Sequence, residues 1–202
     1  SVAVYYSKRY GSSENFITIT PKNPATKNIL YLKDKTGGEI VKQFISTSLY
    51  PKETSTGITV KEMEYIWKIY LGQQSLPYIM FYNTFHSLLK DEIKFDTNNC
   101  KYCNIDSKYL DNSKKLDDFW REYIVEETGD ELELSEICDL YNGTIGTSDD
   151  TEFLDEEFLA MFLMHFYDIK INDKYIRNKK CILWNRGEET DIVFKELRTI
   201  YK

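Results

Sequence analysis

The sequence predicts an α+β protein that is mainly helical. Two observations lead to this class: apolar residues recur at helical spacing in several segments, and short runs of β-branched and aromatic residues separate them. The composition agrees, because 42% hydrophobic and 29% charged residues are ordinary for a globular protein. The 202 residues suffice for two small domains, and we expect one over residues 1–113 and another over residues 114–202.

The first half is expected to begin with short strands. Residues 2–6 and 17–20 are rich in β-branched and aromatic side chains, and residues 29–32 form another strand or a short buried segment. Gly37 and Gly38 mark a turn.

Helices are expected in the rest of this half. One is predicted over residues 39–49, and a second over residues 59–71 begins with the capping-box pair Thr59 and Glu62 and ends at Gly72. Pro77 suits the first turn of a third helix that runs to about Lys90. Residues 91–112 are predicted to be irregular.

The second half has a more regular pattern. A helix over residues 114–126 carries an apolar stripe, and a boundary with the first half is expected near residues 111–115. The predicted elements that follow are a short helix (134–141), a polar loop, an apolar helix (154–167), two strands (168–171 and 174–184) joined by a turn at Asn172 and Asp173, and a last helix (190–201). Helix, helix, loop, helix and hairpin is the order of a winged-helix domain. We expect Trp67, Trp120 and Trp184 to be largely buried.

Charge is distributed unevenly along the chain. The net charge is −7 overall, yet residues 117–168 carry 17 acidic residues against the single basic residue Arg121. Residues 1–115 have a net charge of +5 and residues 169–202 a net charge of +4. Different faces are therefore expected to meet different partners, although two domains with unrelated surfaces would give the same pattern.

The sequence offers little for catalysis, so we expect a binding module and no cofactor. It has only two histidines, His86 and His165, both inside apolar helical segments, and no phosphate-binding glycine loop or nucleophile elbow. Paired acidic residues are interpreted as solvated surface rather than as metal ligands. A metal-dependent nuclease remains the enzymatic alternative.

Cys100 and Cys103 have the spacing of a zinc knuckle. The other cysteines, Cys138 and Cys181, lie in a predicted helix and strand, so a zinc site would need a distant ligand such as His86. Buried or free thiols are the preferred interpretation. Four cysteines in this length do not suggest a disulfide scaffold, and we expect a reducing intracellular compartment, cytoplasm or viral factory.

The predicted hairpin is the best candidate site. Cations there would lie along phosphates, and Tyr175 would stack on an exposed base. The predicted helix over residues 154–167 would be the recognition helix of the domain, but acidic residues occupy its first turn. We therefore prefer contact through the hairpin, which is the wing of this fold, to the reading of bases by this helix. The predicted nucleic-acid-binding residues are Lys170, Lys174, Tyr175, Arg177, Lys179, Lys180 and Arg186.

From Leu116 onward the chain resembles a viral family. The residues concerned are Phe119-Trp120, the segment 131–137 with Leu140-Tyr141, the segment 158–167, Lys174-Tyr175-Ile176, and the segment 181–185. They are similar to the C-terminal region of primase-helicases of large nucleocytoplasmic DNA viruses. The resemblance implies a winged-helix-like fold beside a hexameric motor, and no catalytic residue carries over. Because the chain begins with Ser1, we interpret it as a piece of a longer protein.

The sequence thus predicts a non-catalytic, nucleic-acid-binding accessory module of a viral replication or transcription machine, with DNA preferred over RNA. The alternative is a protein-interaction or oligomerisation domain whose acidic helical face binds a basic partner or a second copy. No membrane association is expected, because no segment approaches the roughly 20 apolar residues of a membrane span.

Overall fold

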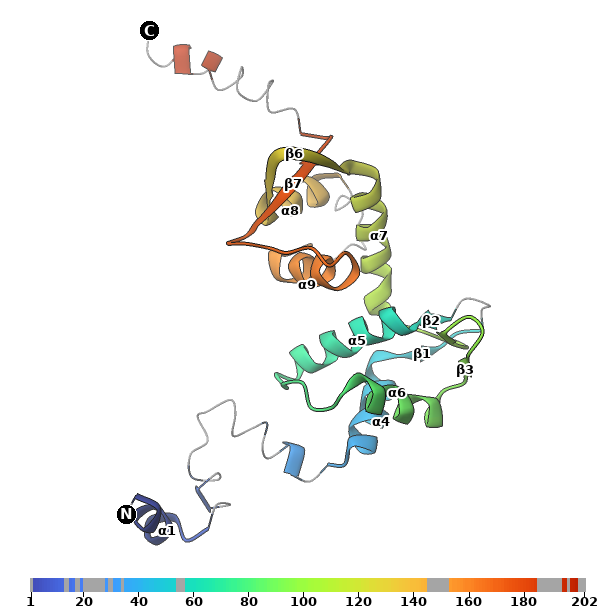
Figure 1. Ribbon diagram of the computed structural model, residues 1–202, viewed down its shortest axis with the longest axis vertical. Helices are drawn as coiled ribbons and strands as arrows, with labels where there is room; N and C mark the ends of the chain where they lie inside the picture. The colour runs from blue at the N-terminus through green and yellow to red at the C-terminus, as the bar shows by residue number, and fades with distance from the viewer. Residues whose placement is uncertain are drawn as a thin grey trace. The chain divides into compact units, whose positions relative to one another are not determined.

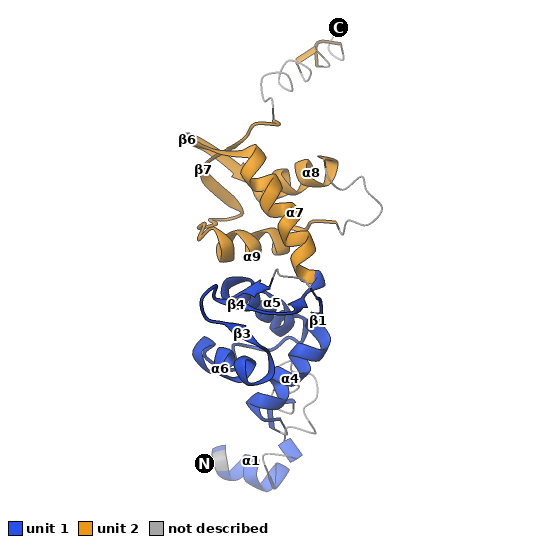
Figure 2. Cartoon of the chain, turned by 90° about the vertical axis from the view of Figure 1, so that its right-hand side faces the viewer, with its two compact units in different colours: residues 1–108 blue, residues 109–202 orange. Residues whose placement is uncertain are grey.

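The computed structural model describes residues 2–12, 15–16, 19, 28, 31–33, 35–53, 57–144, 153–184, 194–195 and 197–199. The chain divides into two compact units, Ser1–Lys108 and Tyr109–Lys202 (Figure 2). Both combine helices with small antiparallel sheets, so the α+β class with a helical majority is confirmed. No helix in the described part of the chain is long and apolar enough to cross a membrane.

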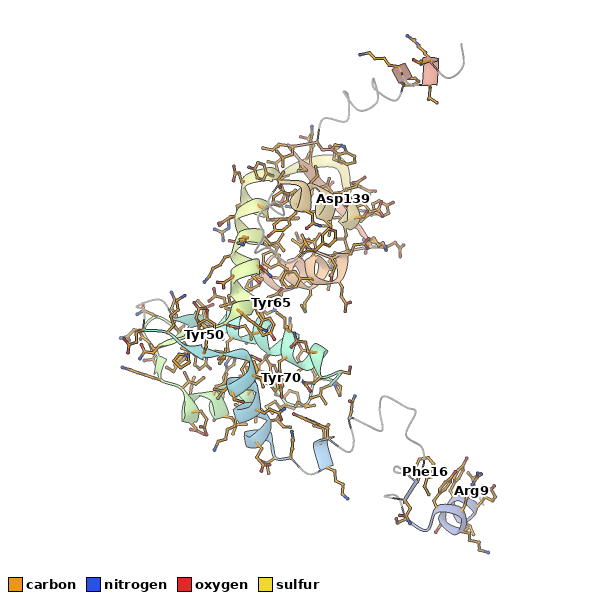
Figure 3. All side chains as sticks on the ribbon, turned by 180° about the vertical axis from the view of Figure 1, so that it is seen from behind. Arg9, Phe16, Tyr50, Tyr65, Tyr70 and Asp139 are labelled. Atoms are coloured by element: carbon orange, nitrogen blue, oxygen red, sulfur yellow. The ribbon has the colours of Figure 1, made fainter. Side chains whose placement is uncertain are left out.

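The core of unit 1 is aromatic and lies between three helices, α4 (Gly37–Ser48), α5 (Val60–Gln73) and α6 (Tyr82–Glu92) (Figure 1). Phe44 packs edge-on against Trp67, whose ring stacks on Phe85 at a centroid distance of 4.4 Å. Tyr65 and Tyr70 of α5, labelled in Figure 3, are also buried. Such aromatic contacts add stabilisation to a core that already removes large apolar areas from water.

Helix α5 confirms its predicted start but ends later than expected. The Thr59 hydroxyl accepts a hydrogen bond from the Glu62 N–H, and the Glu62 carboxylate accepts one from the Thr59 N–H. At the other end, Ser75 adopts φ +53°, its N–H donates to the Gly72 carbonyl, and the Leu76 N–H donates to the Leu71 carbonyl. This is a Schellman closure with serine in the left-handed position.

Short strands hold the ends of these helices together. In one sheet, β2 (Ile58–Thr59) and β3 (Phe95–Asp96) both pair with β4 (Lys101–Tyr102), and in a second, β1 (Tyr50–Pro51) pairs with β5 (Ile105–Asp106). The Lys52 ammonium bonds the buried Asp106 carboxylate at 2.5 Å beside the β1–β5 pair.

Several predictions for this half were wrong. Residues 2–6 belong to helix α1 (Val2–Tyr10), in which Tyr6 stacks on Tyr10 at helical spacing. Gly37 and Gly38 open helix α4 rather than forming a turn. Pro77 follows the closure of α5 and precedes α6, because a left-handed cap reverses the chain first. Residues 91–112 contain two-residue strands, which are too short for an alternating pattern to reveal.

Unit 2 consists of α7 (Lys108–Tyr123), β6 (Ile124–Glu133), α8 (Leu134–Thr144), α9 (Glu156–Phe166) and β7 (Tyr175–Cys181). Its core lies where α7, α8 and α9 meet the inner face of the two strands. Phe119 of α7 packs edge-on against Tyr141 of α8, and Trp120 lies 5.6 Å from the Tyr167 ring. Trp67 and Trp120 are buried as expected, whereas Trp184 is only half-buried.

The strand predictions for unit 2 need correction. Residues 168–171 form no strand, and Asp168, which follows the C-cap residue of α9, takes a left-handed φ of +52°. A single bridge, Asn172 to Tyr175, remains of the predicted hairpin. Strand β7 pairs instead with β6, which includes the end of the helix predicted over residues 114–126 and the residues after it, to which no element was assigned. The predicted strand 17–20 and last helix 190–201 lie mostly outside the described residues.

Candidate functional site: the β6–β7 ribbon

The two strands of unit 2 form a ribbon, residues 124–133 with 175–181, that carries most of the predicted site residues. Its inner face is apolar: Ile124, Leu132, Ile176 and Cys181 are buried against the helices. Its outer face is charged, and the two strands contribute opposite signs. In both strands the buried residues lie near the ends, and the residues between them are mostly exposed.

The register places acidic residues of β6 opposite basic residues of β7. Glu126 is paired with Lys179, and Glu131 is paired with Arg177. The Arg177 Nε atom lies 3.1 Å from the Glu131 carboxylate, and the Lys179 ammonium bonds Glu126. Cross-strand pairs of opposite charge stabilise a ribbon, but exposed ones contribute only about 0–1 kcal/mol each.

A bulge in the middle of the ribbon separates these two ion pairs. Residues 127–130 of β6 fall between paired positions, and Gly129 adopts φ +92°. The Gly129 N–H donates to the Asn178 side chain at 3.2 Å, and Asn178 itself has φ +57°. Asparagine and glycine tolerate this conformation best, so the bulge is built into the sequence.

The residues at the turn before β7 are also engaged. The Lys174 ammonium lies 2.8 Å from the Glu156 carboxylate of α9, and this hydrogen bond and charge raise the pKa of Lys174. The Tyr175 hydroxyl donates to Glu133 at 3.4 Å. The charge of Glu133 is the largest cause of the raised pKa of Tyr175, followed by partial burial.

Three of the predicted phosphate-binding cations therefore face carboxylates of their own unit: Lys174, Arg177 and Lys179. Lys170 and Lys180 are exposed and have no ion pair among the described residues, and Arg186 lies outside that part of the chain. The ribbon carries five carboxylates on β6 against three cations on β7. Its outer face is consequently net acidic, which the basic run of β7 alone does not reveal.

The zinc hypothesis gains no support from the geometry. The described residues include no group of three or more His, Cys, Asp or Glu placed to hold a metal ion. The Cys100 thiol is exposed at the turn between β3 and β4, and Cys103 follows β4. Cys138 and Cys181 are buried in unit 2.

His86 has two protein partners. Its Nδ1 lies 2.7 Å from the Tyr102 hydroxyl and its Nε2 lies 3.0 Å from the Glu64 carboxylate. Burial, with the charge of Glu64, raises the pKa of Tyr102 to about 12, so this phenol stays a neutral donor. Tyr102 is fully buried, and the three residues link α5, α6 and β4 in the core of unit 1.

Sequence reasoning missed β6 and with it the acidic half of the ribbon. A signal was present in the apolar residues Ile124 and Leu132 at the two ends of an acidic stretch, with Gly129 between them. No protein-family model, curated protein or solved structure matches this chain significantly.

Proposed function

We propose that unit 2 is a winged-helix module that binds a basic protein partner through its acidic surface. One observation carries this proposal: cations of the ribbon are paired with carboxylates of β6 and α9, which leaves the ribbon net acidic. A basic partner gains from such a surface through faster encounter and correct orientation more than through raw affinity.

The order of the elements supports the winged-helix part of the proposal. Helix α7, strand β6, helices α8 and α9, the bridge at Asn172 and strand β7 follow one another as in that fold, with the first strand beside the last. The turn at Asp173 and Lys174 has φ values of +47° and +75°, as a tight hairpin of the primed type requires. This short hairpin would be the wing of the fold, and it offers few side chains to a groove of a nucleic acid.

The charges of the ribbon and of α9 also favour a basic protein over a nucleic acid as the partner. Phosphates approaching β7 would meet Glu126 and Glu131 within the same ion pairs, and the first turn of α9 adds Glu156 and Glu157. These four negative charges near a phosphate backbone oppose the counterion release that drives nucleic-acid binding. The same carboxylates attract lysine and arginine side chains.

A nucleic-acid-binding accessory module remains the second candidate. Lys170 and Lys180 are exposed without an ion pair among the described residues, and Tyr175 is 43% exposed. These residues could contact phosphate and a base without displacing an internal pair. The resemblance to viral primase-helicases belongs with this candidate and remains a prediction.

Fluorescence anisotropy with the full chain distinguishes the two candidate functions. A labelled lysine-rich peptide should bind, with affinity falling as salt rises from about 50 to 200 mM, while labelled single- and double-stranded DNA should bind more weakly at every salt concentration. Tighter binding of DNA than of the peptide would overturn the proposal in favour of the second candidate.

Charge reversal locates the binding surface. Glu127 lies exposed in the bulge of β6, so Glu127→Lys is expected to weaken peptide binding by roughly threefold or more at low salt. The matched control is Glu53→Lys, which makes the same charge change at an exposed position of unit 1. Equal effects of the two substitutions would mean that net charge alone, rather than the ribbon surface, attracts the peptide.

A further inference from the structure

A small cavity in unit 2 is lined by residues of α7, α8, the segment 153–155 and α9. Its volume is about 100 Å³, roughly the space of three water molecules or the end of one long side chain. Three of the described residues that line it are aromatic and one is a carboxylate. The described residues that line it are Asn112, Tyr141, Phe153, Leu154, Asp155 and Phe158.

Hydrogen bonds fix the shape of this cavity. The Asn142 side chain donates to the Leu154 carbonyl at 3.0 Å and accepts from the Leu154 N–H at 2.9 Å, so one amide group pairs with both backbone polar groups of Leu154. Asp155 caps α9 by accepting from the Phe158 N–H at 2.7 Å. Leu154 and Tyr141 are buried, so the positions of these two lining residues are set before any ligand arrives.

Phe153 lies at the rim of the cavity with 78% of its surface exposed. A large ring in water at the rim of a cavity is an unused contact surface, unlike the isolated exposed residues that any protein has. With Tyr141 and Phe158 it offers aromatic rings to a guest from more than one element of the unit. Aromatic walls with a nearby carboxylate are the chemistry that recognises an ammonium group.

The electrostatics of the cavity favour a cation over an anion. A helix N-terminus attracts anions with roughly half a positive charge, but Asp155, Glu156 and Glu157 place carboxylates at that end of α9. None of the described residues that line the cavity is basic. Burial first, and then the charges of Glu156 and Asp155, raise the pKa of Cys138 to about 12, so their field reaches into the unit.

We propose that this cavity binds a lysine side chain of the basic partner, with its ammonium group beside Asp155 and the rings of Tyr141, Phe153 and Phe158. The inference rests on the proposed function, because it names the group by which a basic partner would be held. The acidic surface would then bring the partner near, and the cavity would select one residue of it.

The test is a nuclear magnetic resonance titration of the ¹⁵N-labelled full chain with N-acetyl-lysine methylamide into the millimolar range. The neutral probe N-acetyl-norleucine methylamide has a similar aliphatic side chain without the charge. Saturable shifts at residues 153–158 with the lysine probe alone are expected. Equal binding of the two probes, or lysine-probe shifts confined to other parts of the chain, would overturn the proposal.

Two substitutions test the named groups. Asp155→Asn keeps an N-cap residue while removing the charge, and it should weaken binding of the lysine probe by roughly threefold to tenfold. Phe153→Ala removes an exposed ring at little cost to folding and should weaken it by at least roughly twofold. The control is Asp168→Asn, which removes one exposed acidic charge of unit 2 at a left-handed position that asparagine tolerates. A variant at Asp155 that binds as tightly as the control contradicts the assignment.

The lysine-rich peptide distinguishes failure of this inference from failure of the proposed function. If Glu127→Lys weakens peptide binding but Asp155→Asn does not, the cavity is not used and the acidic-surface proposal stands. If the lysine probe saturates the cavity while the peptide does not bind, the cavity assignment stands and the proposed function fails.

Discussion

At the scale of single residues, burial determines the ionisation of Cys138. This thiol is 5% exposed on α8, and burial with nearby acidic charges raises its pKa from the ordinary value of 9.0 to about 12. The folded state therefore holds the proton more tightly than the unfolded state does. The stabilisation that results is complete below the unfolded pKa and is lost as the pH rises from about 9 to about 12.

We expect the free energy of unfolding to fall over that alkaline range more steeply in the wild-type chain than in Cys138→Ala. Urea denaturation at a series of pH values, followed by the fluorescence of the tryptophans, measures the difference between the two. The alanine variant will be less stable at neutral pH because it leaves a small cavity, so the comparison concerns the slope and not the absolute value. Parallel pH profiles of the two proteins would show that Cys138 ionises normally in the folded state.

Individual residues also explain why the predicted basic binding site lies on a surface that is net acidic. Lys174, Arg177 and Lys179 were assigned as phosphate-binding residues from their spacing in the sequence. Their partners Glu156, Glu131 and Glu126 come from distant segments. A local sequence pattern counts the charges of one strand and cannot include those of the strand beside it.

At the scale of elements, the approach of β2 to β4 depends on one glycine. A side-chain carbon added to Gly57 would lie 2.2 Å from the Tyr102 carbonyl oxygen, which is backbone and cannot move aside as a flexible side chain could. The strand β2 begins at the next residue and carries the cap of α5. A shift there would disturb the pairing and the helix start together.

The substitution Gly57→Ala is therefore expected to destabilise the protein by about 1–3 kcal/mol, as overpacking usually does. Chemical denaturation of the wild-type and variant chains measures this difference. Gly143→Ala is the matched control, because nothing lies within 4 Å of the added carbon and alanine is the better helix former. The explanation fails if Gly57→Ala is as stable as the wild type.

At the scale of the whole molecule, each compact unit has its own core. Phe44, Trp67 and Phe85 are central to the core of unit 1, and Phe119 and Phe162 belong to that of unit 2. Chains with two such cores often unfold in more than one transition. We expect Gly57→Ala to lower the unfolding temperature of unit 1 while leaving that of unit 2 within experimental error.

Hydrogen exchange read by mass spectrometry along a temperature series distinguishes the units by peptide. Peptides from α5 and α6 should lose protection earlier in the variant than in the wild type, and peptides from α8 and α9 should not. Cys138→Ala is the reciprocal control and should affect the second group alone. Equal loss of protection in both groups with either variant would mean that the chain unfolds as one cooperative unit.

The sequence by itself determined the helices whose signals lie within a few neighbouring residues. The capping box of Thr59 and Glu62, the periodic apolar stripe of α7 and the apolar length of α9 need no knowledge of the rest of the chain. The uneven charge distribution is likewise a property of composition. These features depend on residues within a few positions of one another, which is why periodicity and spacing recover them.

Only the tertiary structure decided how the strands pair. Strand β7 was assigned a neighbour next to it in the chain, yet it joins β6, with Ile124 opposite Cys181 across a wide sequence separation. That pairing buries Leu132 and Ile176 together and brings acidic and basic residues face to face, which changes the net charge of the ribbon from basic to acidic. The physical reason is that strand pairing satisfies backbone hydrogen bonds and apolar burial over the whole unit, whereas a local sequence pattern records only one strand at a time.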